Sequence, residues 1–271
     1  MVVDLPLELE REIFEWAARE SLTIARRLVF VAHRVKAWVD PILYESVTLY
    51  DRSNAVQFLS TAEAKPSHIS YVKRLCIHCN VGYWQARRVL ALCPELDNLS
   101  CWISEPRLRP FLANQRLGGL SFMLSGLAYD AEDSPPDFTN IFYSRVTHLH
   151  FTDRWVSWVT WTGFHVLPKL THIAFLYDIT SISDDTKVTN AISDILSTCP
   201  SLILCALIYT HSLSSKFDSI EDPRFVAVHV PQAAFGKGED LLRRKTDIWG
   251  KATEGRRKRS GACAVQQASR S

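Results

Sequence analysis

Two short stretches of this sequence set the pattern for its fold: residues 146–151 read VTHLHF, and residues 170–175 read LTHIAF. In each, apolar residues follow the first apolar residue after three and five positions, and His148 and His172 take the same place in the pattern. The same apolar trio recurs along the middle of the chain. Its occurrences are Val72/Leu75/Ile77, Leu96/Leu99/Cys101, Leu117/Leu120/Phe122, Val146/Leu149/Phe151, Leu170/Ile173/Phe175, Leu202/Cys205/Leu207 and Phe225/Val228/Val230, with Tyr44/Val47/Leu49 as a candidate eighth.

The spacing of the trios predicts alternating strands and helices. Their first members lie 24, 21, 29, 24, 32 and 23 residues apart. The last two members of each trio alternate as in a strand, so both side chains point into one core. Helical patterns lie between the trios, over residues 83–92, 155–166 and 186–196. The sequence therefore predicts an α/β fold with a parallel concave sheet and outer helices. A generic α/β fold with the same periodicities is the alternative.

The trios of residues 46–235 resemble the leucine-rich-repeat family in its irregular form, whose repeats are about 20–29 residues long. The family usually has Asn or Cys three residues after the trio, and here only Asn80 of the seven corresponding residues matches. The resemblance implies a solenoid whose stacked strands face a partner protein.

The first 45 residues have a separate helical pattern. Asp4 and Pro6 form a helix-start signal, and Leu9 and Ile13 then fall on one helix face. The LPLEL opening at residues 5–9 and the VAHRV stretch at residues 31–35 resemble the F-box family. The residues that would bind the family's Skp-family linker protein are Leu5, Pro6, Leu9, Ile13, Phe14, Val31, Val35, Trp38, Leu43 and Tyr44.

This second resemblance implies a substrate-recognition adaptor of an SCF-type ubiquitin ligase. The N-terminal helices would bind the Skp-family linker and, through it, a cullin, while the repeats bind a protein substrate. Such a chain has no catalytic residue and no cofactor of its own, and it is a monomer outside the complex. The alternative is a repeat-only interaction scaffold, in which the N-terminal helices simply cap the repeat core.

Residues that flank the trio members in each strand are predicted to line the concave face. Adjacent strands lie about 4.8 Å apart, so His148 and His172 should be lateral neighbours, with His150 two residues further along. Three imidazoles could bind a transition metal or make ligand binding sensitive to protonation. No carboxylate or cysteine completes a metal site, so a protein-binding surface is favoured. The candidate substrate-binding residues are Arg74, His78, Asn98, Trp102, Met123, His148, His150 and His172.

The C-terminal region combines a predicted helix with a basic tail. Leu204, Ala206 and Ile208 make the concave side of the last strands apolar, which suggests that a terminal helix covers it. We assign that capping helix to residues 236–254 and a basic tail to residues 255–271. The basic clusters in the two segments resemble a bipartite nuclear-import signal.

The composition excludes several classes of function. With 31 Lys and Arg against 29 Asp and Glu, the net charge is +2, so no global field favours nucleic acid or an anionic membrane. No apolar stretch has the length and continuity of a membrane span, and charged residues close to Met1 indicate that no signal peptide is present. We therefore expect a cytoplasmic or nuclear location. Phosphate-loop, nucleophile-elbow and zinc-protease motifs are missing, so we expect no catalysis.

Overall fold

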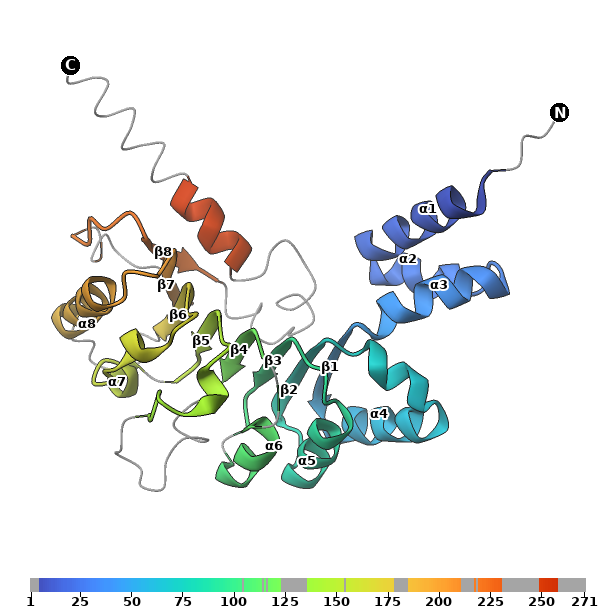
Figure 1. Ribbon diagram of the computed structural model, residues 1–271, viewed down its shortest axis with the longest axis horizontal. Helices are drawn as coiled ribbons and strands as arrows, with labels where there is room; N and C mark the ends of the chain where they lie inside the picture. Colours follow the sequence, from blue (N-terminus) through green and yellow to red (C-terminus); the bar gives the residue numbers. More distant parts are fainter. Residues whose placement is uncertain are drawn as a thin grey trace, which may run out of the picture.

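The computed structural model describes residues 5–103, 105–113, 115, 117–122, 136–153, 155–177, 185–210, 217, 219–230 and 249–257. These residues form an α/β fold around a single parallel sheet of eight strands, and the strands lie side by side in the order of the sequence (Figure 1). The strands are β1 (Ser46–Asp51), β2 (Arg74–Asn80), β3 (Asn98–Cys101), β4 (Gly119–Phe122), β5 (His148–Phe151), β6 (His172–Tyr177), β7 (Leu204–Tyr209) and β8 (Phe225–His229).

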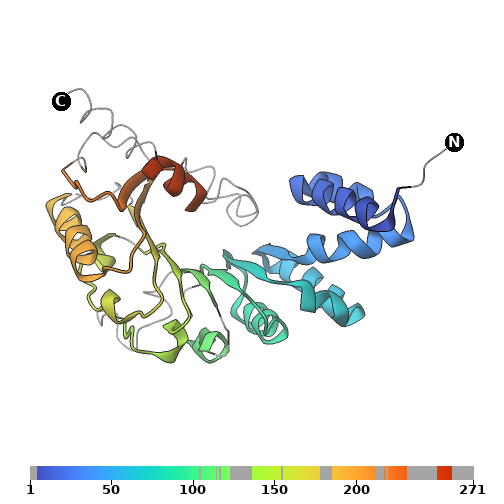
Figure 2. The same ribbon diagram turned by 45° about the horizontal axis from the view of Figure 1, so that its top comes forward.

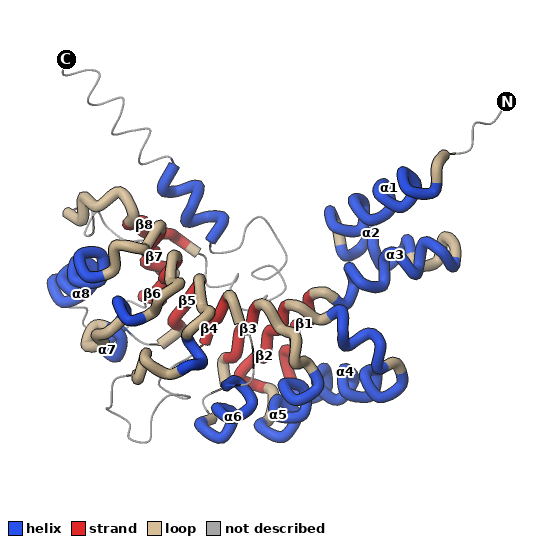
Figure 3. Tube along the Cα trace, viewed as in Figure 1, coloured by secondary structure: helices blue, strands red, loops and turns tan. Residues whose placement is uncertain are grey.

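Helices cover one face of the sheet, which we call the outer face (Figures 1 and 3). Three N-terminal helices extend from the β1 edge, and a C-terminal helix of residues 249–257 lies over the opposite, inner face. The helices of the sheet region are α4 (Arg52–Ala64), α5 (Tyr83–Leu92), α6 (Arg109–Ala113), α7 (Trp155–Trp158) and α8 (Asp185–Thr198), with 3-10 helices at Pro66–Tyr71, Pro106–Leu108, Ile141–Tyr143 and Phe164–Val166. The N-terminal helices are α1 (Leu7–Glu20), α2 (Leu22–Leu28) and α3 (His33–Tyr44).

The predicted alignment of the apolar trios is confirmed from β1 to β7. In β5 and β6, for example, Leu149 pairs with Ile173 and Phe151 pairs with Phe175. The candidate eighth trio belongs to the same ladder through β1. The second members form the row Val47, Leu75, Leu99, Leu120, Leu149, Ile173 and Cys205, and the third members form the row Leu49, Ile77, Cys101, Phe122, Phe151, Phe175 and Leu207.

The predicted trio of the last strand is wrong in its register. Phe225 lies beside Cys205 and Val228 beside Ile208, so Phe225 takes the place of a second member instead of a first. Val228 and Val230 belong to an apolar cluster on the inner face. Both faces of this strand are apolar, and a pattern that only distinguishes apolar from polar residues cannot fix the register of such a strand.

One backbone arrangement repeats where the chain enters successive strands. The carbonyl of Thr147 accepts hydrogen bonds from the N–H groups of Thr171 and His172, at 2.9 and 3.0 Å. Five other carbonyls accept in the same way from two consecutive N–H groups of the next strand. This repeated bond holds neighbouring strands in one register. The five are the carbonyls of Glu45, Lys73, Asp97, Gly118 and Thr171.

The outer face packs on an aromatic core. The rings of Phe151 and Phe175 are stacked 5.5 Å apart, and Trp158 lies 4.4 Å from Phe175. The indole N–H of Trp158 donates to the carbonyl of Leu176 at 3.1 Å, so its polar atom is satisfied inside the core. The predicted helix over residues 155–166 is too long, because α7 ends at Trp158 and a left-handed Gly163 (φ 89°) precedes a 3-10 turn.

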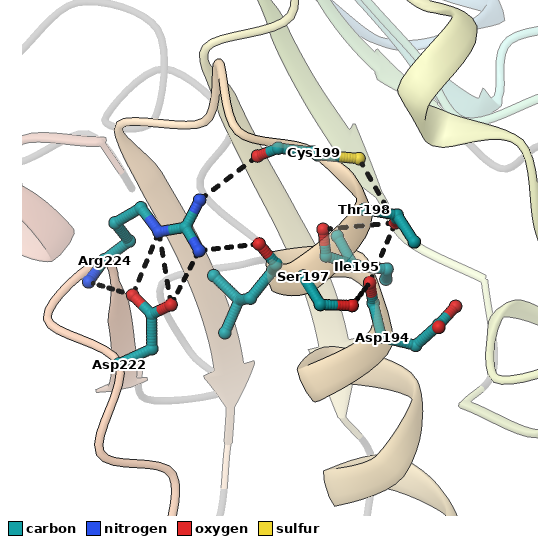
Figure 4. Close-up of polar contacts among 8 residues, drawn as sticks. Asp194, Ile195, Ser197, Thr198, Cys199, Asp222 and Arg224 are labelled. Carbon is teal, nitrogen blue, oxygen red and sulfur yellow. Dashed lines mark hydrogen bonds and ion pairs between the residues drawn. The ribbon is translucent and has the colours of Figure 1, made fainter.

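Arg224 ties β8 to the end of α8 (Figure 4). Its guanidinium donates to the carbonyls of Leu196 (2.6 Å) and Cys199 (3.1 Å), where the helix leaves carbonyls unpaired. It also pairs with Asp222 at 2.6 Å, and hydrogen bonds from Arg224 hold the pKa of Asp222 below its usual value. One side chain therefore satisfies a helix end and a loop carboxylate together.

We expect Arg224→Ala to lower the free energy of unfolding by about 2 kcal/mol, because hydrogen bonds to charged groups contribute about 1.5–3 kcal/mol. Urea unfolding checks this value. Arg88→Ala is the matched control, since Arg88 pairs with Glu63 at 2.7 Å while both side chains are more than 60% exposed, and such pairs contribute about 0–1 kcal/mol. Equal losses in the two variants would contradict the anchoring role of Arg224.

Candidate protein-binding surfaces

The three N-terminal helices pack around a small core of their own. Ala18, Ala25, Val35 and Val39 are buried between them. Small residues at these positions let α1, α2 and α3 approach closely, but they leave few apolar side chains inside. The larger residues that border this core, such as Trp38, are only partly buried.

Many of the large apolar side chains of this module are exposed instead. Leu9, Ile13 and Trp16 recur along one face of α1, and they are 48%, 56% and 67% exposed. Phe30, at the turn after α2, is 88% exposed. Exposed apolar residues gathered on one helix face are a candidate contact surface. The exposed large apolar residues of the module are Leu5, Leu7, Leu9, Ile13, Trp16, Ile24, Phe30 and Val31, against six others in the rest of the described chain.

The residues predicted for linker binding fall into three groups. Leu5, Pro6, Leu9, Ile13 and Val31 are exposed. Val35 is fully buried in the module core, which gives it a structural role in this conformation. Leu7, Trp16, Ile24 and Phe30 extend the exposed surface beyond the predicted set, and Trp16 could have been included because it follows Leu9 and Ile13 at helical spacing. Four predicted residues are half-buried: Phe14, Trp38, Leu43 and Tyr44.

The module joins the sheet through the end of α3. The ring of Tyr44 lies 4.3 Å from that of His68, and Glu45 forms an ion pair with Arg74 at 3.3 Å. In both ribbon views α1 and α2 stand clear of the sheet (Figures 1 and 2). The exposed stripe of α1 therefore does not serve to close the open end of the sheet core.

His148 and His172 are neighbours on the inner face, as predicted. Their rings stack 4.1 Å apart with an angle of 8° between their planes. The hydroxyls of Thr147 and Thr171 each donate to a backbone carbonyl and lie 2.9 and 2.8 Å from the Nδ1 atoms of these histidines. Since each hydroxyl proton is already used, each Nδ1 carries a proton and donates to its threonine. The rings are thereby held in one orientation.

His150 lies in a different row and does not complete a metal site with the other two histidines. Its Nδ1 is 2.8 Å from the hydroxyl of Ser121, its side chain is 3% exposed, and its Nε2 has no hydrogen-bond partner among the described residues. Burial lowers the pKa of His150 to about 4. Within the described part of the chain, no cluster of three or more His, Cys, Asp or Glu side chains is arranged to hold a metal ion.

The remaining candidate substrate-binding residues lie towards the β1 end. Arg74 is held by its ion pair with Glu45, and Asn98 is half-buried. His78 meets Trp102 edge-on at 4.5 Å, and Tyr50 lies 5.6 Å from His78 on the other side. Burial lowers the pKa of His78, which disfavours a positive charge on its ring. Met123 lies outside the described residues.

The C-terminal helix covers the apolar end of the inner face, as predicted. Ala252 packs with Leu204, Ala206 and Ile208 in one cluster. The helix continues to residue 257 instead of ending at residue 254, so the first basic residues of the predicted tail, at 256 and 257, are helical. Residues 236–248 of the predicted helix and residues 258–271 of the tail are outside the described set.

Comparison with known proteins gives no assignment for these surfaces. No protein-family model matches the chain, and no curated protein sequence matches it. Among the described residues, no helix has the length and apolar character that a membrane span requires.

Proposed function

We propose that this chain is a non-catalytic substrate-recognition adaptor of an SCF-type ubiquitin ligase. Its F-box-like N-terminal helices bind a Skp-family linker protein and, through it, a cullin. Its strands and outer helices, as irregular leucine-rich repeats, bind a protein substrate. The observation that carries the proposal is the exposed apolar surface of α1 and of the turn after α2. The adaptor acts in the cytoplasm or the nucleus.

The physical reason is the cost of leaving this surface in water. Burying apolar surface is worth roughly 25 cal/mol per Å², and the module has few other places to bury it because its core is built of small residues. A partner helix laid against Leu9, Ile13 and Trp16 would bury all three at once. Stable docking of the module on a helical linker is therefore the simplest use of this surface.

A repeat-only interaction scaffold is the second candidate. It requires the N-terminal helices to act as a cap for the sheet core. The position of α1 weighs against it, because α1 stands clear of the sheet and its Leu9, Ile13 and Trp16 are exposed. The two candidates make opposite predictions about the linker protein, and a direct binding measurement separates them.

We expect Ile13→Asp to weaken binding of a purified Skp-family linker at least 30-fold, because a charge replaces an apolar group at the centre of the contact and hot-spot losses are about 2 kcal/mol or more. Val156→Asp is the control: Val156 is 49% exposed, close to the 56% of Ile13, but it lies on α7. Biolayer interferometry measures both affinities, and circular dichroism checks folding.

The outcome decides between the candidates. Capture of the linker by the intact protein and by Val156→Asp, but not by Ile13→Asp, supports the adaptor. If the intact protein captures none of the Skp-family linkers tested, the ligase proposal fails and the interaction scaffold remains.

A further inference from the structure

The inner face of the sheet changes character at β6. From β1 to β5 its middle row consists of Thr48, Cys76, Ser100, Ser121 and His150, and from β6 onwards the row continues as Ala174, Ala206 and Val226. The outer face of β6 and β7, and Phe225 of β8, already belong to the main core. These strands are thus apolar on both faces, and the inner face of β6 to β8 needs a cover.

The C-terminal helix fits this surface through one side with small residues. Trp249, Ala252 and Gly255 recur every three residues, so they lie on one helix face. Ala252 is 0% exposed. A Cβ atom on Gly255 would lie 2.9 Å from a methyl group of Val226, so only glycine lets the helix approach this closely. The helix face that makes this contact therefore has an aromatic residue followed by small residues three and six positions later.

The stacked rings of His148 and His172 form the contact site, or seat, for the aromatic residue of the helix. The ring of Trp249 meets His148 edge-on at 5.2 Å and His172 at 5.7 Å. Both imidazoles are already oriented by Thr147 and Thr171 from within their own strands. This seat therefore depends on the sheet and not on the helix, and it is available to any aromatic side chain presented at the same place.

The helix itself is held weakly by its own sequence. Its described residues, 249–257, include two glycines, Gly250 and Gly255, and each glycine in a helix costs about 1 kcal/mol relative to alanine. Its outward side is exposed at Thr253, Glu254 and Arg257. The helix is therefore stabilised mainly by the surface on which it lies, as a docked peptide would be.

We propose that the inner face of β6 to β8 is a helix-binding surface, and that the C-terminal helix occupies it as an internal stand-in for a substrate helix of the same chemistry. The substrate class is an amphipathic helix with an aromatic residue followed by alanine, glycine or serine three and six positions later. That the bound helix belongs to a substrate rests on the proposed adaptor function. The existence of the helix-binding surface does not, and it is tested separately. Binding of such a helix displaces the internal one.

The test uses the full chain with the internal helix undocked. Ala252→Glu places a carboxylate where the alanine has no exposed surface, so the helix should leave the sheet. A fluorescein-labelled peptide of residues 246–260 (TDIWGKATEGRRKRS) is then added, and its fluorescence anisotropy is followed. We expect it to bind Ala252→Glu at least tenfold more tightly than the unmodified protein, because a tethered competitor acts at an effective concentration of about 1 mM. The same peptide with Glu in place of Ala252 should not bind.

Controls separate undocking from damage. Thr253→Glu changes an exposed residue of the same helix and should leave the peptide excluded. Gly255→Val is a second way to undock the helix, since the added side chain collides with Val226. Hydrogen–deuterium exchange of residues 249–257 reports whether the helix has left, and circular dichroism reports whether the sheet remains folded.

Each result bears on the proposal. Peptide binding by both undocked variants, and not by Thr253→Glu, supports it. Absence of peptide binding in a variant whose helix exchanges freely overturns it, and so does unfolding of both undocking variants, because the helix would then be an integral part of the core. Binding of the Skp-family linker is measured on the same proteins. If the unmodified protein does not bind the linker, the adaptor function is contradicted, but the proposal of a helix-binding surface is not affected.

Discussion

Replacing Phe175 with alanine is expected to lower the free energy of unfolding by about 3–5 kcal/mol, the range for large-to-small changes at buried aromatic positions. Phe175 is 0% exposed and lies at the centre of the outer-face core. Its ring contacts Phe151 at 5.5 Å, Trp158 at 4.4 Å and Phe164 at 5.9 Å. Strands β5 and β6, α7 and the 3-10 turn before β6 all meet at this one side chain, so the cavity has no flexible neighbour to fill it.

Urea unfolding followed by tryptophan fluorescence and by circular dichroism measures the loss. Two probes are needed because proteins built from successive strand–helix units can unfold in parts. Trp84→Ala is the control: it also removes an aromatic ring, but Trp84 is 63% exposed on α5, so a change within about 0.5 kcal/mol is expected. A loss below about 1 kcal/mol in Phe175→Ala would show that the aromatic row is not the centre of the core.

The sheet could be predicted because its determinants are local and repeated. Side chains alternate strictly along a strand, so Leu149 and Phe151 must face the same core. The same spacing around Ile173 and Phe175 then places the two strands side by side. The rule fails at β8 because Val228 and Val230 are apolar for a different reason: they pack on the inner face, under the C-terminal helix.

Helix lengths were predicted less well, because a single backbone conformation can end a helix. The α5 boundaries at residues 83–92 are confirmed. The pattern at residues 155–166 is equally apolar, yet the helix stops after one turn. Trp155, Trp158 and Trp161 remain buried without a continuous helix, since the left-handed Gly163 redirects the chain into a second short turn. Apolar spacing alone does not reveal this.

The candidate surfaces also combine features that the local sequence predicts with features that it does not predict. Adjacency of His148 and His172 follows from strand register alone, and it is confirmed. The position of Trp249 against both rings depends on where a distant helix docks, which no local pattern specifies. In the N-terminal module, the resemblance named Val35 as a contact residue, but its burial depends on how three helices pack around small residues. Phe30 was missed because a turn has no helical stripe to place it.

Lowering the pH from 7.5 to 5 is expected to remove about 2 kcal/mol of stability through His150 alone. Burial lowers the pKa of His150 from 6.5 to about 4 in the folded protein, whereas the unfolded chain keeps a value of about 6.5. Below pH 6.5 the unfolded state therefore binds the proton first, and the folded state is disfavoured until the pH falls through 4. The contribution is fully present above pH 6.5 and is lost progressively below it.

The unpartnered Nε2 atom of His150 is the structural reason for this direction. Its Nδ1 is paired with Ser121, and its cross-strand neighbour Ala174 offers no charge. In the doubly protonated ring both nitrogens carry a proton, and the buried Nε2–H has no acceptor among the described residues. His172 also has its pKa lowered to about 4, by burial first and then by His148 and Arg256, so the background pH dependence must be subtracted.

His150→Gln performs that subtraction, because Gln does not titrate while the other histidines still do. Urea midpoints of both proteins are compared at pH 7.5, 6.5, 5.5 and 5.0, and the variant should lose about 2 kcal/mol less over this range. His165→Gln, at an exposed position, should follow the unmodified protein. Identical pH profiles for all three would mean that the pKa of His150 is the same in the folded and unfolded protein. The expected profile instead means that His150, in the middle row of the inner face, is uncharged at neutral pH.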